Sequence, residues 1–198
     1  LIELKPQEQE EYQREYAVFT SYLRSRGIKL QSVSDFQRFI MRTGRDPEAR
    51  KALLARNKAL RLVLNSEGKI DKLTEYLKSY RNEKALIFTR FNELVYAISR
   101  RFLIPAITHR TPKDERREIL ESFKTGTYNA VVTSQVLDEG IDVPDASVGF
   151  ILRGTGSSRE YIQRLGRILR KKEGKEANLI EFVAKETVET RISQRRHR

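Results

Sequence analysis

The chain has 198 residues, of which 38% are hydrophobic and 33% charged, enough for one substantial domain or for one domain and a smaller appendage. It contains no cysteine and only two histidines, which excludes disulfides and cysteine-ligated zinc and argues against a histidine-built metal site. The net charge of +12 at pH 7 indicates a polyanionic partner, most often nucleic acid, with a generally basic surface as the alternative.

The sequence shows neither a membrane-spanning segment nor a secretory signal. No run of 18 apolar residues is present, so we expect no transmembrane helix and no membrane partner. The first residues, LIELKPQEQEEY, do not resemble a signal peptide. Because the sequence does not begin with Met, we expect it to be part of a longer protein.

The first region, residues 1–64, is predicted to be helical. Residues 6–27 carry apolar side chains at spacings of three or four and end at a glycine, which is typical of an amphipathic helix. Two more helices are predicted at 32–44 and 46–65, the second with Asp46 as N-cap and Pro47 in its first turn.

The same region is strongly basic. Residues 17–60 contain ten basic and three acidic side chains, a local net charge of +7. Arg38, Arg42 and Arg45 are the candidates that we single out for binding phosphates without reading sequence. The alternative is a basic surface with no ligand.

The second region, residues 65–198, alternates strands and helices, which predicts a parallel sheet with helices on both faces. The candidate strands are residues 84–89, 104–108, 128–134, 146–153 and 177–184. The candidate helices are residues 91–102, 112–125, with Thr111 as N-cap and Pro112 as first helical residue, and 158–170.

On the last of these helices, polar and apolar stripes separate. Gln163, Arg167 and Arg170 fall at i, i+4 and i+7, away from the stripe that can pack on a sheet. The planar guanidinium group matches phosphate oxygens and remains charged, so two on one rigid face can stabilise a transferring phosphoryl group. The alternative is a surface helix with ordinary salt bridges.

Polar residues also follow the predicted strands, where ligands bind in open parallel sheets. Ser134 ends one strand and is followed by a loop with Gly140 and with Asp142, which could accept from a ribose hydroxyl; a simple connection is the alternative. Other polar residues at strand ends are Thr89, Arg90, Thr108 and His109, although a lone histidine is more often structural.

The sequence lacks a phosphate-binding loop of the form G-x-x-x-x-G-K-[ST]. Its two Gly-Lys pairs, at 68–69 and 174–175, have neither the upstream glycine nor the following hydroxyl residue. The sequence therefore has arginines that can bind a phosphate but no loop that can cradle one. This combination indicates half of a catalytic site.

Three segments together resemble the C-terminal half of a superfamily 2 helicase. ALIFTRF is similar to motif IV, VVTSQVLDEGIDVPDA to motif V and QRLGRILR to motif VI, in the family's order. The segment GSSREYIQRLGRILRKKEG further resembles XPB-type DNA helicases, particularly the archaeal ones. The resemblance covers about residues 69–183, and residues 17–60 are similar in position and character to the thumb-like insert of that family.

The resemblance implies an RecA-like second motor domain preceded by a small helical thumb-like insert. It implies that Arg167 and Arg170 reach the ATP γ-phosphate, that Gln163 helps to place them, and that Gly140 and Asp142 lie near the nucleotide. The residues after the other strands would lie along the nucleic-acid backbone: Thr89, Arg90, Thr108, His109 and Ser134. Gln135 departs from the pattern, because many helicases carry Asp there.

The function implied is an ATP-dependent DNA translocase that opens duplex DNA in nucleotide excision repair or transcription initiation. ATP and Mg²⁺ would be held mainly by a first RecA-like domain whose motifs are not in this sequence, so this chain alone should be inactive. The implied partners are double-stranded DNA, that first domain, and a repair nuclease or transcription–repair complex. The protein would be intracellular and DNA-associated, in an archaeal cytoplasm or nucleoid or a eukaryotic nucleus. A non-catalytic nucleic-acid-binding or scaffolding module and an RNA helicase half remain as alternatives.

Overall fold

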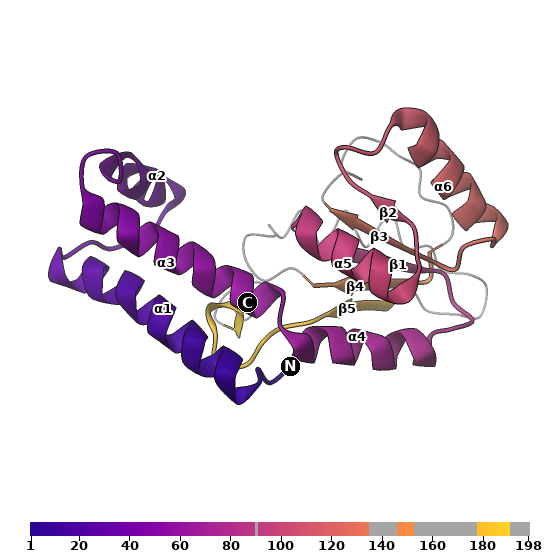
Figure 1. Ribbon diagram of the computed structural model, residues 1–198, viewed down its shortest axis with the longest axis horizontal. Helices are drawn as coiled ribbons and strands as arrows, with labels where there is room; N and C mark the ends of the chain where they lie inside the picture. Colours follow the sequence, from indigo (N-terminus) through magenta and orange to yellow (C-terminus); the bar gives the residue numbers. More distant parts are fainter. Residues whose placement is uncertain (90, 135–145, 153–177, 191–198) are drawn as a thin grey trace. The chain divides into compact units, whose positions relative to one another are not determined.

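The computed structural model describes residues 1–89, 91–134, 146–152 and 178–190, and the chain divides into two compact units (Figure 1). The helical unit is Leu4–Ser66. The sheet unit combines Leu1–Glu3 with Glu67–Arg198. None of the helices in the described residues is long and apolar enough to cross a membrane.

The helical unit consists of the three helices that the apolar spacing predicts. They are α1 (Pro6–Ser25), α2 (Val33–Arg42) and α3 (Pro47–Leu64). Phe19 and Tyr22 of α1 pack with Phe39 of α2 and with small alanines of α3, so aromatic rings fill the space that short side chains leave.

Caps fix where α2 and α3 begin. Asp46 is the N-cap of α3, as predicted, and its Oδ1 accepts hydrogen bonds from the backbone of Glu48 and Ala49. The Tyr22 hydroxyl donates to Asp46 Oδ2 over 2.7 Å and is the main cause that lowers the pKa of this carboxyl. Ser32 and Asp35 form a reciprocal capping box at α2, and hydrogen bonds from Ser32 lower the pKa of Asp35 to about 2.

The sheet unit is built on five parallel strands in the order β2-β3-β1-β4-β5. Their bounds are β1 Ala85–Thr89, β2 Ala106–Ile107, β3 Ala130–Ser134, β4 Val148–Ile151 and β5 Asn178–Glu181. The described helices of this unit are α4 (Glu67–Ser79), α5 (Asn92–Phe102) and α6 (Lys113–Thr125).

Helices cover both faces of this sheet, as the sequence predicts (Figure 1). On one face, Ile87 packs with Leu73 of α4 and Val95 of α5. On the other face, Phe88 packs with Phe123 of α6. All five residues of β1 are buried, because successive side chains of a central strand point into opposite covered faces.

Helix α4 is not among the predicted elements, although Ile70, Leu73 and Leu77 recur at helical spacing. In its first turn, a Cβ on Gly68 would lie 2.7 Å from the Glu3 carbonyl oxygen, so only glycine fits.

Two local predictions are corrected. The strand predicted at 104–108 pairs only over Ala106–Ile107. Pro112 is extended, with ψ of 153°, so α6 begins at Lys113 and Thr111 is not its N-cap. The helix predicted at 158–170 lies outside the described residues.

A buried ion pair joins the two ends of the sheet unit. Lys69 Nζ lies 2.7 and 2.8 Å from the two carboxylate oxygens of Glu189, and the two side chains are 0% and 1% exposed. Glu189 Oε2 also accepts from the backbone N–H of Ala184, directly beside the parallel bridge between Ile2 and Ala184. Burial lowers the pKa of Lys69 from its ordinary 10.5, while the neighbouring carboxylate of Glu189 opposes the shift. The lysine of the first Gly-Lys pair is therefore structural.

We predict that Glu189→Gln lowers the free energy of unfolding at pH 7 by about 3–5 kcal/mol, because it leaves the Lys69 ammonium buried without its counter-ion. With the Glu189 carboxylate gone, burial lowers the pKa of Lys69 and only the charge of Glu181 still opposes the shift. The unfolded chain then binds more protons than the folded one below pH 10.5, so the variant should gain stability as the pH rises towards that value. Urea unfolding between pH 7 and 10 measures both effects.

The matched control is Lys185→Gln, which removes an exposed pair with Glu3 and should change stability little. The double variant Lys69→Met/Glu189→Leu should recover most of the loss, since apolar groups of similar size leave no buried charge. A Glu189→Gln variant as stable as the parent would show that the pair is not needed.

Candidate nucleotide and nucleic-acid edge

The carboxyl ends of β1, β2 and β3 bring predicted site residues to one edge of the sheet. Thr89 is the last residue of β1 and is paired in register with Ser134, the last residue of β3. Thr108 and His109 follow β2, the next strand beyond β3. Parallel strands end at a common edge, so residues 89, 108, 109 and 134 lie together although the sequence separates them.

Asn92, in the first turn of α5, connects two of these residues. Ser134 Oγ donates to Asn92 Oδ1 over 2.6 Å, and Asn92 Nδ2 lies 3.0 Å from His109 Nδ1. Because the serine must donate to the amide oxygen, the amide nitrogen faces the ring and donates to Nδ1. This arrangement leaves the Nε2–H of the neutral imidazole available on an exposed side chain.

Thr108 holds the turn that presents His109. Its Oγ1 accepts from the backbone N–H of Arg110 and lies 3.2 Å from the Tyr96 hydroxyl. Its own N–H donates to Thr111 Oγ1, which is the contact that Thr111 makes in place of capping α6. The Thr108 hydroxyl is therefore engaged within the protein.

The predicted site residues at this edge differ in how far they are buried. Thr89, Thr108 and Ser134 are almost fully buried, whereas His109 is exposed. The hydroxyl oxygens of Thr89 and of its neighbour Thr133 are buried and have no hydrogen-bond partner among the described residues. Buried hydroxyls without partners are uncommon in folded proteins.

The segments that carry the remaining predicted site residues start from the same edge. Ser134 precedes the segment with Gly140 and Asp142, and Leu152 precedes the segment with Gln163, Arg167 and Arg170. Leu152 continues β4 and donates its N–H to Phe88 of β1, which lies between β3 and β4. Two strand spacings put these starting points roughly 10 Å apart. Those five residues, and Arg90, lie outside the described residues.

The predicted phosphate-binding arginines lie in the helical unit. Arg38 is on α2, 75% exposed, and pairs with Asp35 over 2.5 Å. Arg42 is in the last turn of α2, and Arg45 lies between α2 and α3; both are exposed.

Sequence reasoning missed Asn92 and Tyr96. Their signal was present in FNELVY, where an asparagine opens a helix directly after a strand and a tyrosine follows on the same face at i+4. In the described part of the chain, no group of three acidic or histidine side chains could hold a metal ion.

Comparisons with known proteins agree with this geometry. Over 195 residues, the chain is 48% identical to the DNA 3'-5' translocase XPB2 of Sulfurisphaera tokodaii, which covers 98% of the chain and 44% of the relative. Over 140 residues, it is 29% identical to the DNA 3'-5' helicase XPB of Mycobacterium tuberculosis, which covers 70% of the chain and 26% of that relative. The chain thus spans less than half the length of these relatives, and the resemblance to XPB-type helicases is confirmed.

The fold is shared more widely. The SWI2/SNF2 ATPase core of Sulfolobus solfataricus, solved with double-stranded DNA, superposes with a TM-score of 0.68 at 17% identity, over 98% of this chain and 42% of that one. The RecA-like fold is therefore confirmed. Since residues 68–172 match the helicase conserved C-terminal domain, the chain belongs to that family and forms the C-terminal motor domain of a helicase.

Proposed function

We propose that the protein to which this chain belongs is an ATP-dependent translocase on duplex DNA, which opens the duplex in excision repair or transcription initiation. The observation that supports the proposal is the common sheet edge, which brings together buried hydroxyls and an exposed histidine. The segment that contains Asp142 and the segment that contains Arg167 and Arg170 both start from this edge. Its partners would be DNA, a preceding RecA-like domain, and a repair nuclease or transcription–repair complex. This function places the protein on DNA inside the cell.

On the nucleotide side, Arg167 and Arg170 would neutralise charge that develops on the γ-phosphate, with Gln163 placing them. Gly140 and Asp142 would lie by the nucleotide, the carboxylate accepting from the ribose. Mg²⁺ and most of the ATP would be held by the preceding RecA-like domain.

On the nucleic-acid side, His109 is the exposed member and would donate from Nε2 to a backbone phosphate. Ser134 and Asn92 orient it, and Thr108 shapes its turn. Thr89 and Arg90 would complete the track along the backbone. Contacts to phosphate position a protein on DNA without reading sequence, as a translocase requires.

The helical unit would add affinity for phosphates through Arg38, Arg42 and Arg45. Its rigid base suits this role, because the capping box and the Phe39 contacts hold α2 firmly while the arginine side chains remain exposed. We propose that this unit is the thumb-like insert.

In the full-length protein, Arg167→Ala or Arg170→Ala should lower ATP turnover about 10³-fold or more and leave DNA binding intact, which is the usual scale for an arginine that contacts the transferring phosphate. DNA-stimulated ATPase assays measure this effect. Duplex DNA should stimulate more than RNA, which separates the proposal from an RNA helicase.

Arg117→Ala is the control, since Arg117 is an exposed arginine on α6 that pairs with Asp114. It should hydrolyse ATP at the parental rate. Parental turnover in either motif variant would assign that arginine to an ordinary surface helix, and turnover by the 198-residue chain alone would refute the half-site.

Asn92→Ala should release His109 from the Nε2–H form, because the amide donor to Nδ1 is lost. Long-range ¹H–¹⁵N NMR of the imidazoles reports the tautomer, and the chain has only two histidines. DNA affinity should fall several-fold.

His197 serves as an internal control, and its signals should not change. The conservative Asn92→Gln variant should recover less than half of the affinity, since the longer side chain displaces the amide from both partners. A tautomer unaffected by Asn92→Ala would mean that the amide does not orient the ring.

Neutralising Arg38, Arg42 and Arg45 together to glutamine should flatten the slope of log affinity against log salt by about two to three on duplex DNA, because each lost phosphate contact removes nearly one unit. The effect should be equal for unrelated DNA sequences. Fluorescence anisotropy of the full-length protein at several salt concentrations measures the slope.

The matched control neutralises Arg101, Lys113 and Arg117 of the sheet unit, which removes the same net charge from exposed positions. Its slope should equal that of the parent. An unchanged slope in the arginine variant would show that these side chains do not touch DNA phosphates.

A further inference from the structure

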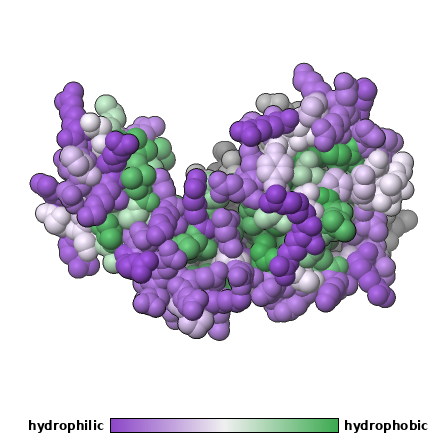
Figure 2. All heavy atoms as spheres, in the orientation of Figure 1, coloured by the Kyte–Doolittle hydropathy of each residue, from purple (hydrophilic) through white to green (hydrophobic). Residues whose placement is uncertain are grey.

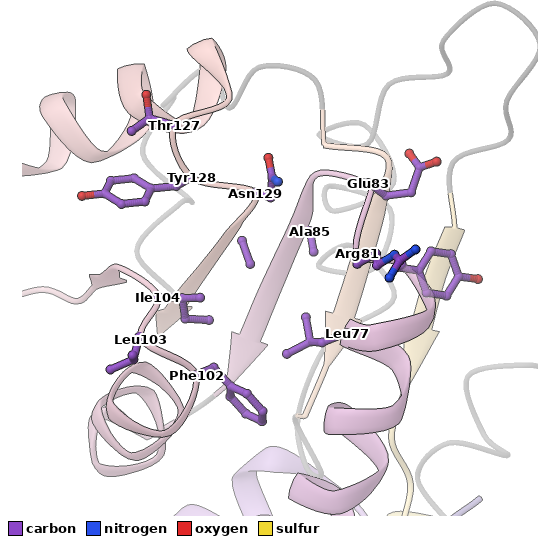
Figure 3. Close-up of a pocket in the computed structure, with 12 residues that line it drawn as sticks. Leu77, Arg81, Glu83, Ala85, Phe102, Leu103, Ile104, Thr127, Tyr128 and Asn129 are labelled. Carbon is purple, nitrogen blue, oxygen red and sulfur yellow. The ribbon is translucent and has the colours of Figure 1, made fainter.

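A cavity lies at the opposite, amino edge of the sheet, where β1 and β3 begin. It has a volume of about 370 Å³ and includes Ala85 and Ala130 in its wall. Figure 3 shows Leu77 of α4 together with Phe102 and Ile104 around the same hollow. A cavity of this size and apolar lining can hold one bulky apolar group.

Leu103 lines this cavity in a conformation that its residue type disfavours. It ends α5 with φ of +53°, in the left-handed region where glycine or asparagine is usual, and it is 89% exposed. Neither local backbone preference nor burial in the described residues accounts for leucine here. Residues held in a disfavoured backbone conformation cluster at sites that bind a ligand or partner.

The surroundings of the cavity are basic. Arg81 lines it, and Lys78, Arg100 and Lys124 stand in the last turns of the helices α4, α5 and α6, which end at this edge. Among the described residues, none of these four side chains is in an ion pair. Glu83, the acidic residue of the lining, already accepts a hydrogen bond from Ser147 over 2.6 Å. The charge is thus complementary to an acidic partner.

Duplex DNA fits this surface poorly, because its outer face offers phosphates and no bulky apolar group. A peptide segment can carry both carboxylates and an aromatic anchor. We propose that the amino-edge cavity docks an acidic peptide segment of a partner protein, with one large apolar side chain beside Leu103 and carboxylates paired with Arg81 and its basic neighbours. Docking here leaves the carboxyl edge free, so it is independent of the function proposed above.

The probe is a fluorescein-labelled ten-residue peptide with one central phenylalanine among aspartates and glutamates, titrated with the 198-residue chain and followed by anisotropy. We expect saturable binding with a micromolar Kd. Replacing the phenylalanine by alanine, or the acidic residues by lysines, should weaken binding at least about tenfold.

The decisive variant is Leu103→Asn. Asparagine tolerates the left-handed conformation better, so the melting temperature should stay the same or rise, while the peptide Kd rises about tenfold or more. Arg81→Gln should weaken binding and make it less dependent on salt. Val33→Asn, at an exposed apolar position in the helical unit, is the control and should bind as the parent does.

Three kinds of outcome would overturn the proposal. The first is a failed peptide titration, either no saturable binding by the parent or a Leu103→Asn variant that binds the peptide as tightly as the parent. The second is displacement of the peptide by a duplex oligonucleotide, which would make the edge a nucleic-acid surface. The third is self-association of the chain in sedimentation that Leu103→Asn abolishes, which would make a second copy the occupant.

Discussion

The common direction of the five strands is the constraint from which the rest of the sheet unit follows. Parallel strands require a crossover after each strand, and the crossovers bring α5 and α6 to opposite faces. Both faces are then closed to solvent, which leaves only the two edges for ligands. The same direction collects every strand exit at one edge and every strand entry at the other, so the two edges differ in chemistry.

Much of this architecture could be predicted from the sequence, because its strands are apolar runs and its helices have regular apolar spacing. The helices of the helical unit and the N-cap role of Asp46 follow from local rules alone. The failures arise where a distant contact decides. Residue 68, in the first turn of α4, must be glycine because the Glu3 carbonyl lies against it, and Pro112 is held extended after a turn that Thr108 and Thr111 build.

The candidate site divides in the same way. Motif spacing identified the residues at the ends of β1, β2 and β3, since the end of a strand is visible in the sequence. It could not identify Asn92, whose role depends on the proximity of Ser134 and His109, 42 and 17 residues away in the chain. Nor could it show that Thr108 is used internally while His109 is exposed. Whether a hydroxyl forms its hydrogen bonds within the protein depends on tertiary packing, and the pattern of residues along the sequence does not reveal it.

The pair between Lys69 and Glu189 also has a consequence for the order in which the protein can be made. Its two residues are 120 positions apart in the chain. At about 5–20 residues added per second, Glu189 is added roughly 6–24 s after Lys69. During that interval α4 cannot settle on the sheet without burying a lone charge. The nascent sheet unit therefore keeps an apolar face uncovered until Glu189 has been added.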